Sequence, residues 1–149
     1  MSEENTLIVA VDDEPVSLRL MEKVLQRYFR VVAVSSGQEA LSILKREEVA
    51  VLITDQRMPV MTGTELLRSA QRINPNTVGL LVTSSNDNET FHDAIMNSGA
   101  FRVISKPWDP DKLTQVVEAA LGKYRTRVEN QKSIQQLRNV KESLKNLSR

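Results

Sequence analysis

The chain has 149 residues, 40% hydrophobic and 26% charged with a formal net charge of +1, a composition typical of one globular domain rather than a disordered chain. It has no cysteine and a single histidine, His92, which excludes a disulfide framework, a thiol nucleophile and a zinc site built from several thiolates or histidines. The N-terminal segment lacks the basic region of a signal peptide, and no stretch approaches the ~20 apolar residues of a membrane span, so we expect a cytoplasmic protein with no membrane contact.

The N-terminal part of the chain predicts three strands and two helices. Continuous apolar runs, typical of strands buried on both faces, occupy Leu7–Val11, Val31–Val34 and Val49–Thr54. Pro15 suits the first turn of a helix, and Ser36 with Glu39 forms a capping box that opens the next helix. The apolar positions expected on the inner faces of these helices are Leu18, Met21, Val24, Leu25, Tyr28, Leu41 and Leu44.

The same alternation continues up to residue 122. Thr62 and Glu65 make another capping box, and Asn74-Pro75-Asn76 stops that helix. Two further strands are expected at Thr77–Thr83 and Phe101–Ser105, separated by a polar loop, Ser84–Asn88, and a helix that ends at Gly99. Asp109 caps the last helix, with Pro110 at its first position. Five strands alternating with five helices favour one doubly wound α/β domain, although the alternation does not give the strand order.

The last helical pattern continues beyond the domain into a segment of different charge. Residues 1–122 carry 12 basic and 17 acidic side chains, a net of −5, whereas residues 123–149 carry 8 and 2, a net of +6. Apolar residues spaced 3, 4 and 3 apart form a heptad pattern, which Asn130, Gln131 and Ser133 interrupt upstream. They are Leu137, Val140, Leu144 and Leu147. We therefore expect a domain at 1–122 and a basic helical linker at 123–149, either a homodimeric coiled coil leading to an output domain or a solvated tail.

The residues suited to chemistry all follow the predicted strands. Asp12 and Asp13 come after the first strand, Asp55 after the third, Thr83 at the end of the fourth and Lys106 after the fifth. In an open parallel sheet, ligands bind outside the carboxyl ends of the strands, so these side chains can converge. Clustered carboxylates favour a divalent cation such as Mg²⁺, and lysine and threonine can bind phosphoryl oxygens. A remaining carboxylate can act as a nucleophile toward phosphorus.

Four stretches in this order resemble the receiver domain of two-component response regulators. They are VDDEP at 11–15, TDQRMPVMTG at 54–63, LLVTSS at 80–85 and GAFRVISKPW at 99–108. The resemblance covers roughly residues 5–122. Within it, QRMP and KPW resemble the receivers of hydrogenase-type transcriptional regulators and of regulators with attached phosphodiesterase domains.

The resemblance implies a flavodoxin-like sheet of order 2-1-3-4-5 and a regulatory phospho-acceptor domain instead of an enzyme. Asp55 would take a phosphoryl group from a phosphohistidine of a sensor histidine kinase or phosphotransfer protein. Asp13 and Asp55, with the backbone carbonyl of Arg57, would hold Mg²⁺, and Asp12 would orient a metal-bound water. Lys106 would pair with the phosphoryl oxygens through a loop in which the Lys106–Pro107 bond is cis, and Thr83 would move to hydrogen-bond the phosphoryl group.

One position departs from the family pattern. Such receivers often place a tyrosine or phenylalanine three residues before the lysine, where it turns inward when the threonine moves. Here Val103 occupies that position and Phe101 is the nearest aromatic, so the usual coupling between threonine and aromatic is in question. Arg57 and Ser85 occupy the two positions that flank the phosphoryl group and tune its hydrolysis.

Two other functions fit part of the pattern. An aspartate-nucleophile phosphatase of the haloacid dehalogenase type would need a second aspartate two residues after the nucleophile, where this chain has Arg57. A phosphorylation-independent, receiver-like adaptor acting through its C-terminal helix is favoured by Val103. Direct nucleic-acid binding is disfavoured because the basic tail has no series of stacking aromatics, and we expect His92 to be solvated.

Overall fold

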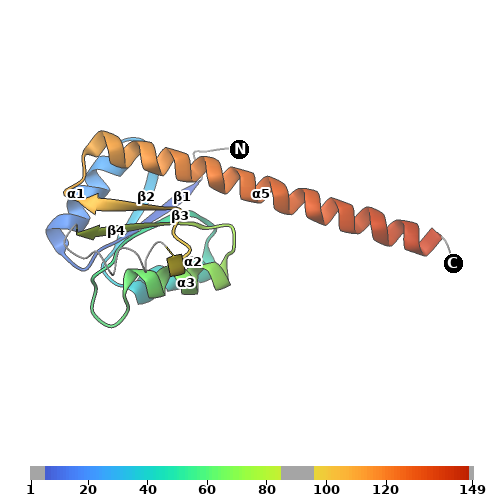
Figure 1. The fold of residues 1–149 in the computed structure, drawn as a ribbon, viewed down its shortest axis with the longest axis horizontal. Coiled ribbons are helices and arrows are strands. Elements are labelled where there is room, and N and C mark those ends of the chain that lie inside the picture. The colour runs from blue at the N-terminus through green and yellow to red at the C-terminus, as the bar shows by residue number, and fades with distance from the viewer. Residues whose placement is uncertain (1–5, 85–95, 148–149) are drawn as a thin grey trace.

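The computed structural model describes residues 6–84 and 96–147, which form a five-stranded parallel sheet covered by helices on both faces (Figure 1). The strands are β1 (Leu7–Val11), β2 (Arg30–Val34), β3 (Val49–Asp55), β4 (Val78–Ser84) and β5 (Arg102–Lys106), in the order β2-β1-β3-β4-β5. The helices are α1 (Pro15–Leu25), α2 (Gly37–Arg46), α3 (Gly63–Ile73) and α5 (Pro110–Leu147). The doubly wound fold and the 2-1-3-4-5 order are therefore confirmed.

Two hydrophobic layers hold the helices to the sheet. Residues of β1, β3 and β4 that point to one face pack with Leu66, Leu67 and Ala70 of α3 and with Ile43 and Leu44 of α2. Residues that point to the other face pack beneath α1 and the first turns of α5. Figure 1 shows this division, with α1 and α5 on one side of the sheet and α2 and α3 on the other. Every residue of β1 and β3 is buried, as a central parallel strand requires.

The predicted helix starts are present with their capping bonds. Pro15 stands at the start of α1, after Glu14. Thr62 and Glu65 form a complete capping box at α3, whereas at α2 the Ser36 hydroxyl accepts from the Glu39 amide and donates to the Glu39 carboxylate. At α5 the Asp109 carboxylate accepts from the amide of Lys112 at 3.4 Å. Local side chains thus satisfy the amides that a helix leaves free at its N-terminus.

One sequence expectation about inward-facing residues was wrong. Helix α1 ends at Leu25, so its periodicity does not set the direction of Tyr28, which is 65% exposed. Phe29, the next residue, packs against the core instead. At α2 the expectation is confirmed, since Leu44 is buried and Leu41, partly buried, packs against the same core.

Part of the predicted alternation falls outside the described residues. The loop expected at Ser84–Asn88, except for Ser84, which ends β4, and most of the helix expected before Gly99 belong to this part of the chain. Gly99 itself is described and has a φ of 75°, a left-handed conformation suited to a glycine that ends a helix.

Helix α5 continues without a break for 38 residues, as the sequence predicts. Its first turns bury Leu113, Val117 and Ala120 against the sheet, and residues 131–147 are all exposed. In Figure 1 the helix lies along the sheet and then projects well past the rest of the molecule. Among the described residues, no helix combines the length and the apolar character needed to cross a bilayer.

Candidate functional site

Three aspartates meet at the carboxyl ends of β1 and β3. Because β1 and β3 are neighbours in the sheet, Asp12 and Asp13 after β1 come close to Asp55 at the end of β3. One carboxylate oxygen from each of the three lies within 4.8 Å of the others. Asp12 is 1% exposed and Asp55 is 7% exposed, whereas Asp13 faces solvent. The sequence prediction that these residues converge is therefore confirmed in geometry.

Lys106 supplies a positive charge to this cluster from β5. Its Nζ lies 2.7 Å from Asp55 Oδ1 and 3.5 Å from Asp12 Oδ2. Burial alone would lower the pKa of Lys106, but the hydrogen bond and charge of Asp55, with those of Asp12, outweigh it and raise this pKa. Lys106 therefore stays a cation at neutral pH. The Lys106–Pro107 bond is cis, as the family resemblance implied.

Asp12 carries a buried oxygen whose hydrogen-bonding capacity is unfilled. Its Oδ1 accepts from the amide of Glu14 at 3.0 Å, but its Oδ2 has no hydrogen-bond partner and only the longer contact with Lys106. Burial, opposed by the Glu14 amide and reinforced by the charge of Asp55, raises the pKa of Asp12. A buried carboxylate oxygen without a partner is costly, and a cation bound beside it removes that cost.

The donor set fits a magnesium ion. Carboxylate oxygens are hard ligands, and Mg²⁺ usually binds one or two carboxylates while it keeps several waters. The exposed position of Asp13 leaves one side of the cluster open to water and to a phosphoryl group. The three aspartates can thus hold a magnesium ion.

The loop after β3 is held by a residue that the sequence analysis did not single out. The side chain of Gln56 accepts from the Thr64 amide at 2.9 Å and donates to the Thr64 hydroxyl at 3.3 Å. It thereby ties the end of β3 to the start of α3. The amide of Arg57 in this loop donates to Asp55 Oδ2 at 3.1 Å, which orients the carboxylate. A glutamine directly after a buried strand was the only signal in the sequence, and it is a weak one.

Gly63 is a second residue whose role the sequence did not reveal. A Cβ atom built at Gly63 would lie 2.4 Å from the carbonyl oxygen of Asp55 and 2.7 Å from Leu81 Cδ1. Any side chain here would push the first turn of α3 away from the strand that carries Asp55. A glycine after a capping threonine is too common a pattern to indicate this contact.

Thr83 lies beside the cluster on the neighbouring strand. Asp55 pairs in register with Val82 of β4, and Thr83 is the next residue along. Its hydroxyl is buried and donates to the carbonyl of Ser84 at 3.5 Å, the outer limit of a hydrogen bond. Among the described contacts, none joins this hydroxyl to Asp55 or Lys106.

The two positions considered for the aromatic switch lie on opposite faces of the sheet. Val103 packs, partly buried, on the face covered by α2 and α3. Phe101 packs on the face covered by α1 and α5, where the guanidinium of Arg102 lies 4.1 Å from its ring centroid. Phe101 therefore cannot take the place of a side chain at Val103. Ser85 and His92 lie outside the described residues.

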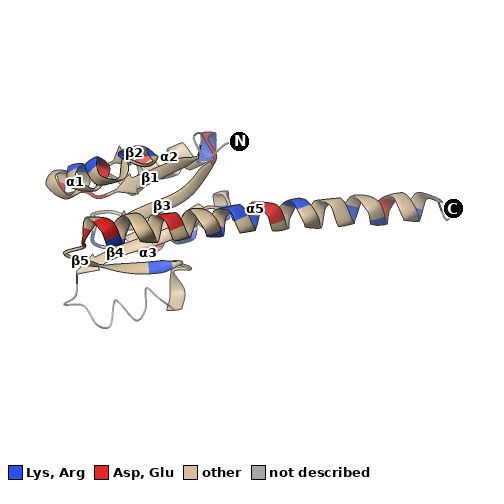
Figure 2. Cartoon of the chain, turned by 90° about the horizontal axis from the view of Figure 1, so that it is seen from above, with Lys and Arg blue, Asp and Glu red and all other residues tan. Residues whose placement is uncertain are grey.

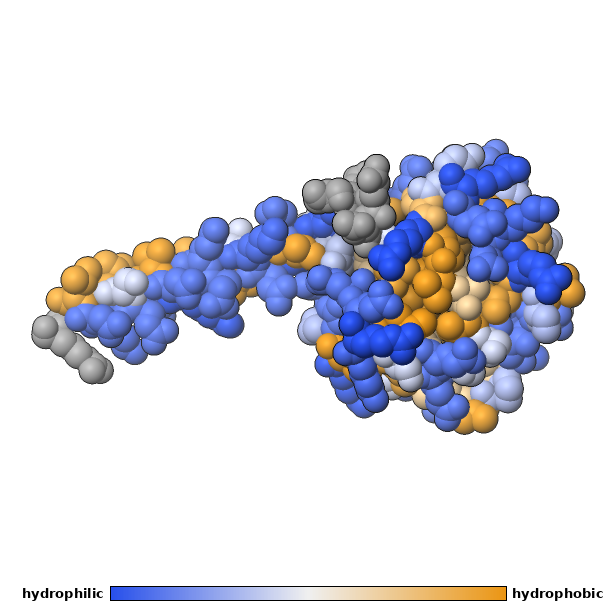
Figure 3. All heavy atoms as spheres, turned by 180° about the vertical axis from the view of Figure 1, so that it is seen from behind, coloured by the Kyte–Doolittle hydropathy of each residue, from blue (hydrophilic) through white to orange (hydrophobic). Residues whose placement is uncertain are grey.

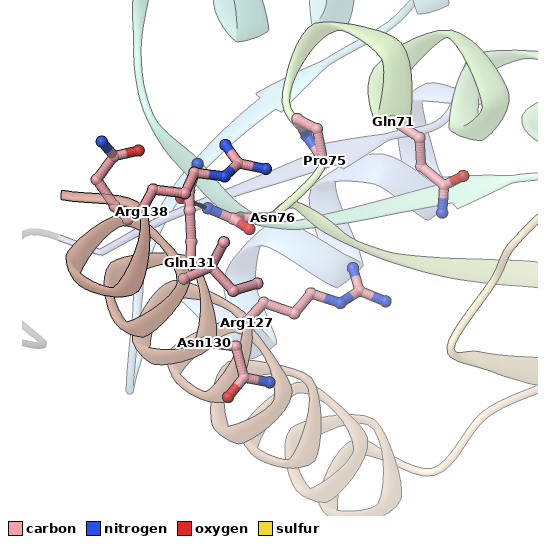
Figure 4. Close-up of a pocket in the computed structure, with 9 residues that line it drawn as sticks. Gln71, Pro75, Asn76, Arg127, Asn130, Gln131 and Arg138 are labelled. Atoms are coloured by element: carbon pink, nitrogen blue, oxygen red, sulfur yellow. Dashed lines mark hydrogen bonds between the residues drawn. The ribbon is translucent and has the colours of Figure 1, made fainter. Parts of the chain in front are cut away.

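A groove of about 700 Å³ lies at the other end of the sheet, between α5 and the turn before β4. Figure 4 shows Arg127, Gln131 and Arg138 of α5 on one side of it and Pro75 and Asn76 on the other. The described residues that line the groove include no aspartate or glutamate. It lacks the carboxylate cluster, so the phosphoryl chemistry expected from the sequence does not belong there.

Comparisons with known proteins point to one family. The sequence matches the family model of the response regulator receiver domain over residues 8–118. The hydrogenase transcriptional regulatory protein HoxA of Cupriavidus necator is 36% identical over 121 residues, which cover 81% of this chain and 25% of HoxA. The two-component response regulator ORR5 of Oryza sativa subsp. japonica is 32% identical over 117 residues, which cover 76% of this chain and 87% of ORR5.

The fold has close counterparts among solved structures. The crystal structure of adenylate cyclase from Rhodopirellula baltica is similar with a TM-score of 0.82 at 30% identity, covering 88% of this chain and 98% of that chain. This chain spans about a quarter of the length of HoxA and most of the length of ORR5. The match to HoxA also agrees with the likeness to hydrogenase-type regulators that the sequence suggested.

Proposed function

This chain belongs to the response regulator receiver family, and on that premise we propose that Asp55 is its phosphoryl acceptor. A receiver domain is a regulatory phospho-acceptor in two-component signalling and not an enzyme, which sets aside the phosphatase alternative. The observation that carries the assignment is the surroundings of Asp55. Its Oδ1 lies 2.7 Å from Lys106 Nζ, within a cluster that includes Asp12 and Asp13.

The chemistry that this geometry supports is nucleophilic attack by Asp55 on phosphorus. A carboxylate oxygen forms a bond to the phosphorus of a phosphohistidine, the P–N bond breaks, and the imidazole nitrogen recovers a proton. The Arg57 amide holds one carboxylate oxygen, and Lys106 lies where it can neutralise charge on the transferred group. The donor is a sensor histidine kinase or a phosphotransfer protein, since family membership implies a cognate kinase.

A magnesium ion completes this proposal. Asp13, Asp55 and the backbone carbonyl of Arg57 would bind it, and Asp12 would act through a metal-bound water. When bound, the ion supplies positive charge that stabilises the negative oxygens of the phosphoryl group. The unpartnered Asp12 Oδ2 and the three clustered carboxylates support this assignment.

Phosphorylation would act as a switch through the neighbouring strand. A phosphoryl group brings a charge of about −2 and three strong acceptor oxygens to the end of β3. The Thr83 hydroxyl is only weakly held, and it can reorient toward that group at little cost. Lys106 would exchange part of its contact with Asp55 for the new oxygens, which shifts the end of β5.

The test is mass spectrometry of the intact protein after incubation with acetyl phosphate and Mg²⁺. We expect an increase by the mass of one phosphoryl group, which Asp55→Asn abolishes. Asp109→Asn is the matched control, because Asp109 is an exposed capping residue and its loss should leave the adduct in place. An adduct that persists in Asp55→Asn would show that Asp55 is not the phosphoryl acceptor.

A second candidate is an adaptor that works without phosphorylation. Two observations favour it. Val103 occupies the position where many receivers have an aromatic ring that moves together with the threonine, and Phe101 packs on the other face of the sheet. Equal oligomeric state and equal affinity for partners before and after phosphorylation would establish this candidate and overturn the switch.

We further propose that residues 123–149 link the receiver to an output module. The length of HoxA, about a quarter of which this chain matches, supports such an arrangement. The uninterrupted helix from Pro110 to Leu147 gives the link a defined direction.

A further inference from the structure

Four apolar side chains form an exposed stripe on the projecting part of α5. Leu137, Val140, Leu144 and Leu147, called the seam here, are 69%, 56%, 61% and 81% exposed. Figure 3 shows hydrophobic atoms gathered along one edge of the projecting helix. Their spacing of 3, 4 and 3 residues is the heptad spacing of coiled coils, in which Leu137 and Leu144 take position a and Val140 and Leu147 take position d.

The seam faces away from the domain that carries it. In an α-helix each residue turns by about 100°, so positions along α5 can be compared by angle. Leu113, Val117 and Ala120, which pack on the sheet, point in nearly one direction. The seam residues point in roughly the opposite direction by the same count. A second helix can therefore approach the seam without meeting the domain of the same chain.

The break in the heptad pattern upstream has a structural explanation. Gln131 accepts a hydrogen bond from Asn76 at 2.5 Å, and Arg127 donates to the carbonyl of Thr77 at 3.0 Å, so this stretch is attached to its own domain (Figure 4). Residues 131–147 are all exposed. Pairing is thus confined to residues 130–147, a shorter region than the 123–149 expected from the sequence.

We propose that the seam binds the seam of a second copy of this chain, in a parallel two-stranded coiled coil. Counting back seven residues from Leu137 places Asn130 at position a, although the apolar pattern itself does not reach it. An asparagine at a single a position specifies register and two strands, because its amide is satisfied by the same residue of the partner. Leucine at a with the β-branched Val140 at d favours coiled coils of three or four helices. Asn130 at position a acts against this tendency and favours two helices.

The charges beside the seam suit a second copy better than an acidic partner. The flanking e and g positions from 134 to 147 are Ile134, Gln136, Lys141 and Ser143, of which one is charged. The other basic residues of this stretch, Arg138 and Lys145, take b positions away from the contact. Figure 2 shows basic residues distributed along the projecting helix. An acidic helix would therefore find a single charge to pair with, and two identical helices meet with little repulsion.

The same positions favour the parallel direction. In a parallel pair Lys141 at e lies near Gln136 at g of the other helix, which can accept a hydrogen bond from it. In an antiparallel pair that matches the four seam residues, Lys141 lies near its own copy, and like charges repel.

Sedimentation of the unmodified full chain over a wide concentration range tests the pairing. We expect a monomer–dimer equilibrium that Leu144→Asp shifts to monomer, because it places a charge in the apolar contact. Gln135→Asp is the control, since it adds the same charge to an exposed position on the opposite side of the helix. A monomer at all concentrations, a trimer or tetramer, or equal dimerisation of Leu144→Asp would each overturn the proposal.

Disulfide trapping tests the direction. The chain has no cysteine, so Leu137→Cys carries a single thiol. In the parallel pair the two thiols are adjacent and oxidise to a covalent dimer, whereas in the antiparallel pair they lie about 15 Å apart along the axis. Rapid crosslinking of Leu137→Cys, but not of Gln135→Cys, is expected, and the absence of a difference would contradict the parallel arrangement. Neither experiment uses phosphorylated protein, so their failure would leave the proposed function unaffected.

Discussion

A single glycine sets how closely α3 approaches the strand that carries Asp55. We expect Gly63→Ala to lower the free energy of unfolding by about 1–3 kcal/mol, because its Cβ would collide with the Asp55 carbonyl in a packed site. Gly122→Ala is the control, since a Cβ atom at Gly122 within α5 would meet only the end of the Arg125 side chain at 4.0 Å and alanine there should stabilise by up to ~1 kcal/mol. Urea denaturation of both variants gives the comparison. Equal effects would mean that the close approach at Gly63 is not a constraint.

The unpartnered oxygen of Asp12 makes the stability of the protein depend on its cation. Adding Mg²⁺ should raise the free energy of unfolding by about 2.7 kcal/mol at a hundred times the dissociation constant. Asp12→Asn should stabilise the metal-free protein, since it removes a buried charge, and should reduce the gain from Mg²⁺. Thermal denaturation with Mg²⁺ and with a chelator measures both effects, with Asp111→Asn in exposed α5 as the control. A midpoint that does not respond to Mg²⁺ would contradict the metal site.

At the scale of an element, Tyr124 reports how firmly α5 is attached to the sheet. Burial raises the pKa of Tyr124 to about 12, and the charge of Glu48 and a hydrogen bond to it act in the same direction. Because the folded pKa lies above the ordinary value of 10.0, this contribution to stability is complete below pH 10 and is lost as the pH rises through about 12.

An absorbance titration tests that attachment. The chain has two tyrosines, so Tyr28→Phe leaves Tyr124 as the only chromophore of its kind. We expect its transition near pH 12 in the folded protein, and nearer the ordinary value in denaturant or after Glu48→Gln. Ionisation of Tyr124 near pH 10 in the folded protein would show that α5 is exposed to solvent around this residue.

At the scale of the whole molecule, the sequence predicted what depends on local or periodic patterns. The apolar runs, the capping residues and the strand-end aspartates are read from neighbouring positions, and the strand order followed from the family resemblance. The contacts of Gly63 and Gln56 depend on how α3 lies over β3 and β4, which no local pattern encodes. Tyr28 was misplaced for a similar reason, since helical spacing says nothing beyond the residue where the helix ends.

The same limit applies to the tail. The heptad spacing was visible, but the side of the helix that contacts the domain was not. The bonds of Arg127 and Gln131 to the domain explain why the apolar pattern pauses and then resumes on the opposite side of the helix.

The attachment of α5 also has a mechanical consequence. The helix is held where β3 and β4 begin, by Tyr124 beside Glu48 and Arg127 at Thr77, while the acidic cluster lies where β3 ends. Beyond Arg127, about 20 residues of α5 extend for some 30 Å. A tilt of the helix by about 5° at Arg127 would move its C-terminal end by roughly 2.6 Å. A small rearrangement in the sheet would therefore become a larger displacement at the end of α5, where the proposed pairing takes place.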